Sequence, residues 1–173
     1  MNERDMHEVT YLADVALFHG LTADQLLAIA AIAEPRYFKP GDILIHEGDS
    51  GDAMYVLVKG RVRVSRTLTL SLSRTTVGEA EKSFAEFDDS EHPSFGEMAL
   101  LENTHRGATV TLLTTGEVLE IRHDDFVQLC EEDLALAYTV TRNIAIELNT
   151  RLQRTNQDVL KLSSALSLAL SRR

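Results

Sequence analysis

The stretch Phe95-Gly96-Glu97-Met98-Ala99-Leu100-Leu101-Glu102-Asn103-Thr104-His105-Arg106-Gly107-Ala108-Thr109-Val110 indicates which fold this chain adopts. A glycine and an acid open a short apolar segment that predicts one helical turn, with free N–H groups at its start that suit an anion. Gly96 lets the backbone approach a ligand closely. Arg106 can hold a phosphate through two hydrogen bonds, and Glu97 can accept hydrogen bonds from sugar hydroxyls. The stretch therefore predicts a pocket for a small phosphorylated sugar.

The same residues resemble the phosphate-binding cassette of cyclic nucleotide-binding domains. The pattern of that cassette is Phe-Gly-Glu, an apolar helical turn, a short loop and Arg-small-Ala-Thr/Ser-Val, and every position is filled here. The resemblance implies that Glu97 binds the ribose 2′-hydroxyl. It also implies a set of phosphate-binding residues, namely Gly96, Met98, Ala99, Arg106, Gly107, Ala108 and Thr109.

A second resemblance concerns the base of the nucleotide. Residues 151–156, Arg-Leu-Gln-Arg-Thr-Asn, are similar to the part of the dimerisation helix of catabolite activator proteins whose Thr-Ser pair meets the adenine amino group. It implies that Thr155 bonds adenine in its own pocket and that Asn156 reaches the pocket of a partner. In guanine-preferring family members a threonine follows the cassette arginine, and here that residue is Gly107. We therefore expect cAMP, and less readily cGMP, as the ligand, and no cofactor.

Composition narrows the class of protein. The 173 residues carry a net charge of −10, which is poorly suited to duplex DNA or to an anionic membrane surface. The single cysteine, Cys130, cannot form an internal disulfide, and no apolar run approaches the length of a membrane span. We expect a cytoplasmic protein that binds neither nucleic acid by itself nor a membrane. The histidines lack metal-ligand spacing and no catalytic constellation is apparent, so we expect neither a metal site nor an enzyme.

Hydrophobic periodicity predicts the local structure. A short helix is expected within residues 8–20, and a second over Ala23–Ala33, with a capping box formed by Thr22 and Gln25. Short strands are expected over residues 43–45, 54–58, 61–65, 68–72 with a continuation at 75–77, 108–113 and 118–121, and a short helix is expected to begin at Phe126 with Asp124 as its cap. The acidic residues 78–94 are predicted to form a solvated loop, or alternatively a lid or partner contact.

The last forty residues contain no glycine or proline, which predicts one long helix to about residue 170. Apolar or small residues recur at alternating steps of four and three: Leu148, Leu152, Thr155, Val159, Leu162, Leu166 and Ala169. This spacing is typical of a coiled coil and predicts a parallel homodimer, with the polar Thr155 fixing its register. The alternative is a helix that packs back on its own domain.

Together, the resemblance covers residues 12–160 and implies an α+β fold. It comprises N-terminal helices, an eight-stranded antiparallel β-roll of the jelly-roll or double-stranded β-helix type, and a long C-terminal dimerisation helix. Residues 1–131 are expected to form the nucleotide-binding domain and residues 132–173 the dimerisation element. The expected function is a cyclic-nucleotide sensor that signals through this helix, with its downstream effector unassigned. The alternatives are a fragment of a Crp-type transcription regulator without its helix-turn-helix, and a scaffold that no longer binds nucleotide.

Overall fold

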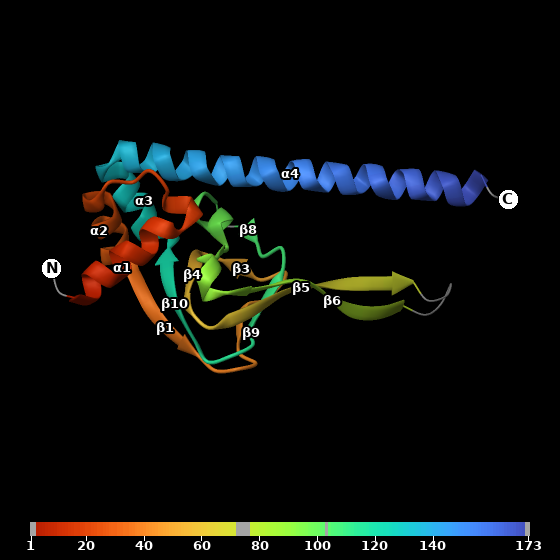
Figure 1. Cartoon of the computed structure of the whole chain (residues 1–173), viewed down its shortest axis with the longest axis horizontal. Coiled ribbons are helices and arrows are strands. Elements are labelled where there is room, and N and C mark those ends of the chain that lie inside the picture. Colours follow the sequence, from red (N-terminus) through yellow and green to blue (C-terminus); the bar gives the residue numbers. More distant parts are fainter. Residues whose placement is uncertain (1–2, 72–76, 103, 172–173) are drawn as a thin grey trace.

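A computed structural model describes residues 3–71, 77–102 and 104–171 of the chain. A long helix lies across a β-roll, and three shorter helices gather at one end (Figure 1). The helical elements are α1 (Glu3–Asp14), η1 (Ala16–Phe18), α2 (Ala23–Ile32), η2 (Asp89–Glu91), η3 (Glu97–Leu100), α3 (His123–Glu132) and α4 (Leu134–Ser171). The strands are β1 (Ala33–Phe38), β2 (Ile43–Ile45), β3 (Ser50–Gly51), β4 (Ala53–Lys59), β5 (Arg61–Ser71), β6 (Val77–Asp88), β7 (Ser94–Phe95), β8 (Thr104–His105), β9 (Thr109–Leu112) and β10 (Gly116–Arg122).

The β-roll consists of two packed antiparallel sheets. In the described part of the chain, one four-stranded sheet has the order β1-β10-β4-β7 and the other the order β2-β9-β5-β6. A two-stranded ribbon, β3-β8, lies beside them. The apolar residues between the sheets form one core, and the helices form a second core against β4 and β10. This arrangement confirms the predicted α+β fold with an eight-stranded antiparallel roll.

Strand β1 was not predicted, because Pro35 lies within it. The helix before it ends at Ile32, and β1 pairs with β10 in a register that sets Pro35 opposite Leu119. Proline cannot donate a hydrogen bond, but β1 is an edge strand of its sheet, so one side of it needs no donor. The predicted helix was therefore one residue too long, and residues 34–37, for which no element was predicted, belong to β1.

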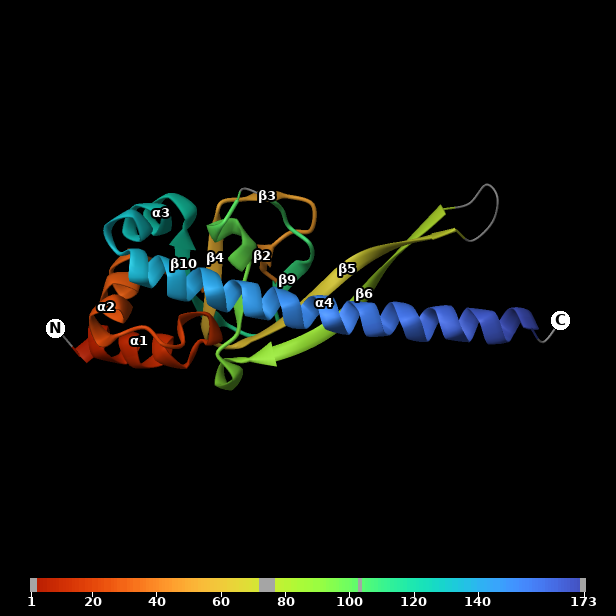
Figure 2. The ribbon, with the colours of Figure 1, turned by 90° about the horizontal axis from the view of Figure 1, so that it is seen from above.

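The prediction of a solvated loop was wrong for residues 78–88, which belong to β6; residues 89–93 form a short turn and connection, and the alternative of a lid or partner contact stays a prediction. Strand β6 pairs with β5 from Arg61↔Asp88 out to Ser71↔Val77, interrupted by one bulge after Val64. The resulting hairpin extends away from the roll on the same side as the end of α4 (Figures 1 and 2). Residues 78–83 of β6, Gly-Glu-Ala-Glu-Lys-Ser, are almost all polar in sequence, so the first half of β6 lacks the apolar alternation by which a strand is recognised. Thr75 and Thr76 of the predicted continuation lie outside the described residues.

Helix α4 has an anchored half and a free half. Leu136, Val140 and Ile144, four residues apart, are fully buried against the helical core. The Nδ2 of Asn143 also donates to the carbonyl oxygens of Leu17 and His19. From residue 149 to 165 every side chain is exposed, and the helix continues past the roll (Figure 2). Only the first half therefore packs back on its own domain.

The predicted capping box of α2 is confirmed, since Gln25 N donates to Thr22 Oγ1 and Thr22 N to Gln25 Oε1. The predicted start of α3 was three residues late. That helix begins at His123, and Asp124 lies in its first turn, where its charge favours the helix dipole. Helix α4 is capped by Asp133, whose Oδ1 accepts hydrogen bonds from two backbone N–H groups at 2.9 Å.

Candidate functional site

A cavity of about 830 Å³ lies between the roll, the η3 turn and helix α4. The predicted ligand residues that line it are Gly96, Glu97, Met98, Arg106, Gly107 and Ala108. Ala99 and Thr109 do not line it. Ala99 is buried, and the Thr109 hydroxyl accepts a hydrogen bond from Glu47 N at 3.1 Å. Six of the eight cassette positions thus meet in one concave site.

The guanidinium of Arg106 is held in place by backbone carbonyls. Its Nη2 donates to the oxygen of Ala53 at 2.6 Å, and its Nη1 to the oxygen of Gly96 at 3.4 Å. A Cβ on Gly51 would lie 1.9 Å from Arg106 Nε, and one on Gly96 would lie 2.3 Å from Nη1. Two glycines therefore make the space that Arg106 occupies, and the charge is fixed before any anion arrives.

The η3 turn starts at Gly96, whose φ of 77° is in the left-handed region that suits glycine. Ala99 N donates to Gly96 O at 2.9 Å and closes the turn. From the opposite side, His123 Nδ1 donates to Ala99 O at 2.9 Å, which identifies Nδ1 as the protonated ring nitrogen. The turn that carries Glu97 and Met98 is therefore supported by the first residue of α3.

The carboxylate expected at the ribose is buried and paired. Glu97 is 3% exposed, and its Oε1 accepts a hydrogen bond from Arg151 Nη1 at 2.7 Å. The other Arg151 nitrogen, Nη2, donates to Glu147 one turn earlier on α4. Burial alone lowers the pKa of Arg151, but the negative charges of Glu97 and Glu147 outweigh it and raise the pKa overall. The Arg151 guanidinium is therefore charged and forms an ion pair across the cavity.

One face of α4 forms a wall of the cavity, through Glu147, Arg151 and Arg154. Their spacing of four and three residues places them on a single side of the helix. Thr155 is rotated from Arg154 by about 100° and is exposed, with its hydroxyl donating to Arg151 O at 3.0 Å. Asn156 is also exposed, and neither of these two residues lines the cavity of the single chain.

Sequence reasoning missed four residues of the site: Gly51, Glu147, Arg151 and Arg154. Gly51 belongs to a Gly-Asp-Ser-Gly-Asp segment that reads only as a turn. The three helix residues carry a usable signal, because charges at steps of four and three form a stripe adjacent to the predicted coiled-coil positions.

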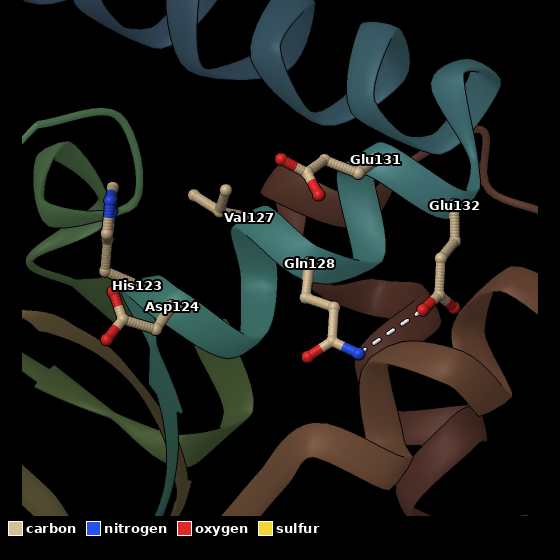
Figure 3. Close-up of a pocket in the computed structure, with 6 residues that line it drawn as sticks. All are labelled: His123, Asp124, Val127, Gln128, Glu131 and Glu132. Carbon is tan, nitrogen blue, oxygen red and sulfur yellow. Dashed lines mark hydrogen bonds between the residues drawn. The ribbon is translucent and has the colours of Figure 1, made fainter.

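A second, shallow hollow lies on α3 and is lined by His123, Asp124, Val127, Gln128, Glu131 and Glu132. Figure 3 shows Gln128 turned toward Glu132, to which its Nε2 donates at 3.4 Å. Three carboxylates and no arginine or lysine line this hollow, which would repel a phosphate, whereas three arginines accompany the three carboxylates that line the larger cavity. The larger cavity is therefore the candidate site for an anionic ligand.

No group of three or more histidine, cysteine, aspartate or glutamate side chains is placed to hold a metal ion within the described ranges. Among the same residues, no helix is both long and apolar enough to cross a membrane.

The comparisons with known proteins show the family to which the chain belongs. The family model "cyclic nucleotide-binding domain" matches residues 35–133, which is more than half of the chain and includes the whole cassette. The chain belongs to the cyclic nucleotide-binding domain family.

Its relatives carry the domain in several kinds of protein. The chain is 34% identical to glutaminase 1 of Bradyrhizobium diazoefficiens over 160 residues, covering 92% of the chain and 24% of that protein. It is 30% identical to the cAMP-dependent protein kinase regulatory subunit of Dictyostelium discoideum over 132 residues, covering 75% and 37%. The crystal structure of Thermus thermophilus catabolite activator protein is similar with a TM-score of 0.71 and 28% identity, covering 86% of this chain and 63% of that one. The chain thus spans well under half the length of the first two.

Proposed function

We propose that this chain is a cyclic-nucleotide sensor whose ligand is cAMP. In this proposal the cyclic phosphate meets Arg106 and the N–H groups at the start of η3, and the ribose 2′-hydroxyl meets Glu97. The fixed guanidinium of Arg106 supports the phosphate contact, because a preorganised charge needs no rearrangement on binding. The absence of a side chain at Gly107 is the ground for preferring adenine over guanine.

The observation that carries the proposal is the ion pair between Arg151 on α4 and Glu97 on the η3 turn, at 2.7 Å. A ribose that hydrogen-bonds to Glu97 changes the partner of Arg151, and therefore the free energy with which α4 is held against the cavity. A ligand shifts a conformational equilibrium only through such a differential contact. Occupancy of the pocket is in this way passed to the long helix.

We further propose that α4 joins two copies of the chain in parallel. Leu152, Val159 and Leu162 of the predicted coiled coil are all more than half exposed in the single chain. These three residues belong to the same four-and-three series as Leu148, which packs against the helical core. A second copy of α4 would cover this stripe. Thr155 lies on the same stripe, and Asn156 follows it, so a partner helix would bring both near the interface, where we place the adenine contact.

Calorimetric titration with cAMP and cGMP tests the sensor proposal. The wild type should bind cAMP, and Arg106→Ala should lose roughly 2 to 5 kcal/mol of binding free energy, the scale for losing one partner of a close charge pair. Arg63→Ala is the matched control, because Arg63 pairs with Glu86 on the exposed hairpin, away from the cavity. Binding of neither nucleotide would favour the scaffold alternative, and unchanged binding by Arg106→Ala would refute the phosphate assignment.

A further inference from the structure

Arg154 is a cationic side chain on the cavity wall with no partner of its own. Among the described residues, no hydrogen bond or ion pair engages its guanidinium. The other two arginines of the cavity are engaged, Arg106 by backbone carbonyls and Arg151 by Glu97 and Glu147. Arg106 keeps further N–H donors for the phosphate, but among the described residues of the cavity Arg154 is the arginine whose whole guanidinium is left to a ligand.

The remaining acidic groups of the cavity already have partners. Glu147 and Glu97 pair with Arg151, and Glu91 accepts a hydrogen bond from Asp88 N at 3.3 Å. The imidazole of His92 lies against the ring of Tyr11, with centroids 4.4 Å apart and ring planes tilted by 49°. A ligand group that reaches α4 beyond Arg151 thus meets the hydrogen-bond donors of Arg154, while each of the three carboxylates of the cavity already accepts a hydrogen bond.

The base of a bound nucleotide fits the part of the cavity near Arg154. With the phosphate at Arg106 and the ribose at Glu97, the rest of the cavity runs between an apolar wall and α4. That wall is formed by side chains of the roll interior, Ile45, Val64 and Phe87 among them. An aromatic base can lay a face on this wall while one of its edges turns toward the helix.

The chemistry of that edge distinguishes the two purines. An arginine guanidinium offers five N–H donors and no acceptor. Guanine presents two adjacent acceptors, O6 and N7, whereas adenine presents the acceptor N7 beside an amino group that is itself a donor. The guanidinium can therefore donate two hydrogen bonds to guanine. At adenine, one of its N–H donors would face the amino group, which is also a donor and cannot accept a hydrogen bond.

Resting on the sensor function proposed above, we propose that Arg154 is a specificity-determining residue that reads the O6/N7 edge of the base and raises the affinity for cGMP relative to cAMP. It acts against the adenine preference expected from Gly107. The net preference of the wild type is the balance between the effects of Arg154 and Gly107. The contribution of Arg154 is measured by the change in the ratio of cGMP affinity to cAMP affinity when Arg154 is substituted.

The test is a calorimetric titration of cAMP and cGMP into the wild type, Arg154→Ala and Arg154→Gln. Removal of the guanidinium should weaken cGMP relative to cAMP by about 5- to 150-fold, the range for one bidentate arginine–guanine pair. Arg154→Gln should move the ratio at least as far, because a glutamine amide pairs with the N6/N7 edge of adenine. Arg142→Ala, at another exposed arginine of α4 outside the cavity, should leave the ratio unchanged.

Three results would overturn the inference. Equal weakening of both nucleotides by Arg154→Ala would mean that the guanidinium only stacks on the base or supplies charge. Unchanged affinities for both nucleotides would mean that Arg154 does not contact the base, while their binding would leave the sensor function standing. Binding of neither by the wild type would remove the sensor function, and this inference with it. Thermal denaturation of each variant checks that the fold is intact, which the exposure of Arg154 leads us to expect.

Discussion

Arg151 Nη1 lies 2.7 Å from Glu97 Oε1, although the two residues are 54 positions apart in the chain. This ion pair spans the cavity and is the direct polar link between α4 and the turn that carries the cassette. Glu97 is almost fully buried, while Arg151 remains about half exposed. The carboxylate therefore depends on Arg151 for compensation of its charge, whereas the guanidinium keeps contact with water.

Arg151→Ala should destabilise the ligand-free protein by about 1–3 kcal/mol. The loss is smaller than for a fully buried pair, because water can enter beside Glu97 once the half-exposed guanidinium is gone. The double variant Glu97→Gln with Arg151→Ala should recover most of the loss, since no buried charge remains. Urea unfolding followed by circular dichroism measures both. Full additivity of the two substitutions would show that the pair does not couple α4 to the cassette turn.

Gly51→Ala should weaken nucleotide binding about tenfold or more, equivalent to ~1.4 kcal/mol. The added Cβ would overlap the Arg106 guanidinium, which has to leave the position set by the Ala53 and Gly96 carbonyls. The midpoint of thermal unfolding should change little, because Gly51 does not have a positive φ.

Ser50→Ala is the matched control for this substitution, because Ser50 is the exposed neighbour of Gly51 in β3 and does not line the cavity. Titration calorimetry and thermal denaturation compare the two variants. Equal weakening by both would show that a general disturbance of β3, and not displacement of Arg106, explains the effect.

Leu162→Glu should reduce the molecular mass in solution from a dimer to the 19.2 kDa of one chain. Two glutamates facing each other in a coiled coil repel each other and remove an apolar contact. Leu160→Glu should leave the dimer intact. Leu160 is 68% exposed and Leu162 is 71% exposed in the single chain, and both lie on α4. The two residues differ in that Leu162 is one of the predicted coiled-coil positions and Leu160 is not. Light scattering gives the masses, and a monomeric wild type would refute the proposed assembly.

Asp133 should make the stability depend on pH in the acid range. Hydrogen bonds from Gln25 Nε2 and from the N–H groups of Leu136 and Ala135 lower the pKa of this carboxyl. In the unfolded chain the carboxyl takes up a proton near its ordinary pKa of about 3.9, whereas in the folded chain it does so only at a lower pH. Its stabilising contribution is thus complete above about pH 5 and is lost as the pH falls through the folded pKa.

Asp133→Asn tests this contribution, because asparagine can still cap α4 but does not ionise. The difference in the free energy of unfolding between wild type and variant should shrink as the pH is lowered from 5 to 2.5. Denaturant titrations across this range measure it, and a constant difference would contradict the assignment.

The cassette and the long helix could be predicted because their evidence is local. Phe95 to Val110 is one continuous segment, and α4 is recognised by its apolar spacing and the lack of glycine and proline. Strand β6 was missed because its first half is almost entirely polar and carries little periodicity, and β1 because Pro35 is tolerated only at a sheet edge. Both elements are defined by their pairing partners, which lie far away in the sequence.

The sequence by itself determined the class of site: an anion turn at Gly96, an acid for the sugar at Glu97 and a cation at Arg106. Only the tertiary structure decided which face of α4 completes it. One residue along a helix turns a side chain by about 100°, so the docking of α4 through Leu136, Val140 and Ile144 directs Arg151 and Arg154 into the cavity and leaves Thr155 on the exposed stripe. The orientation of α4 about its own axis is fixed by packing far from the site. It therefore cannot be predicted from the sequence of residues 151–156.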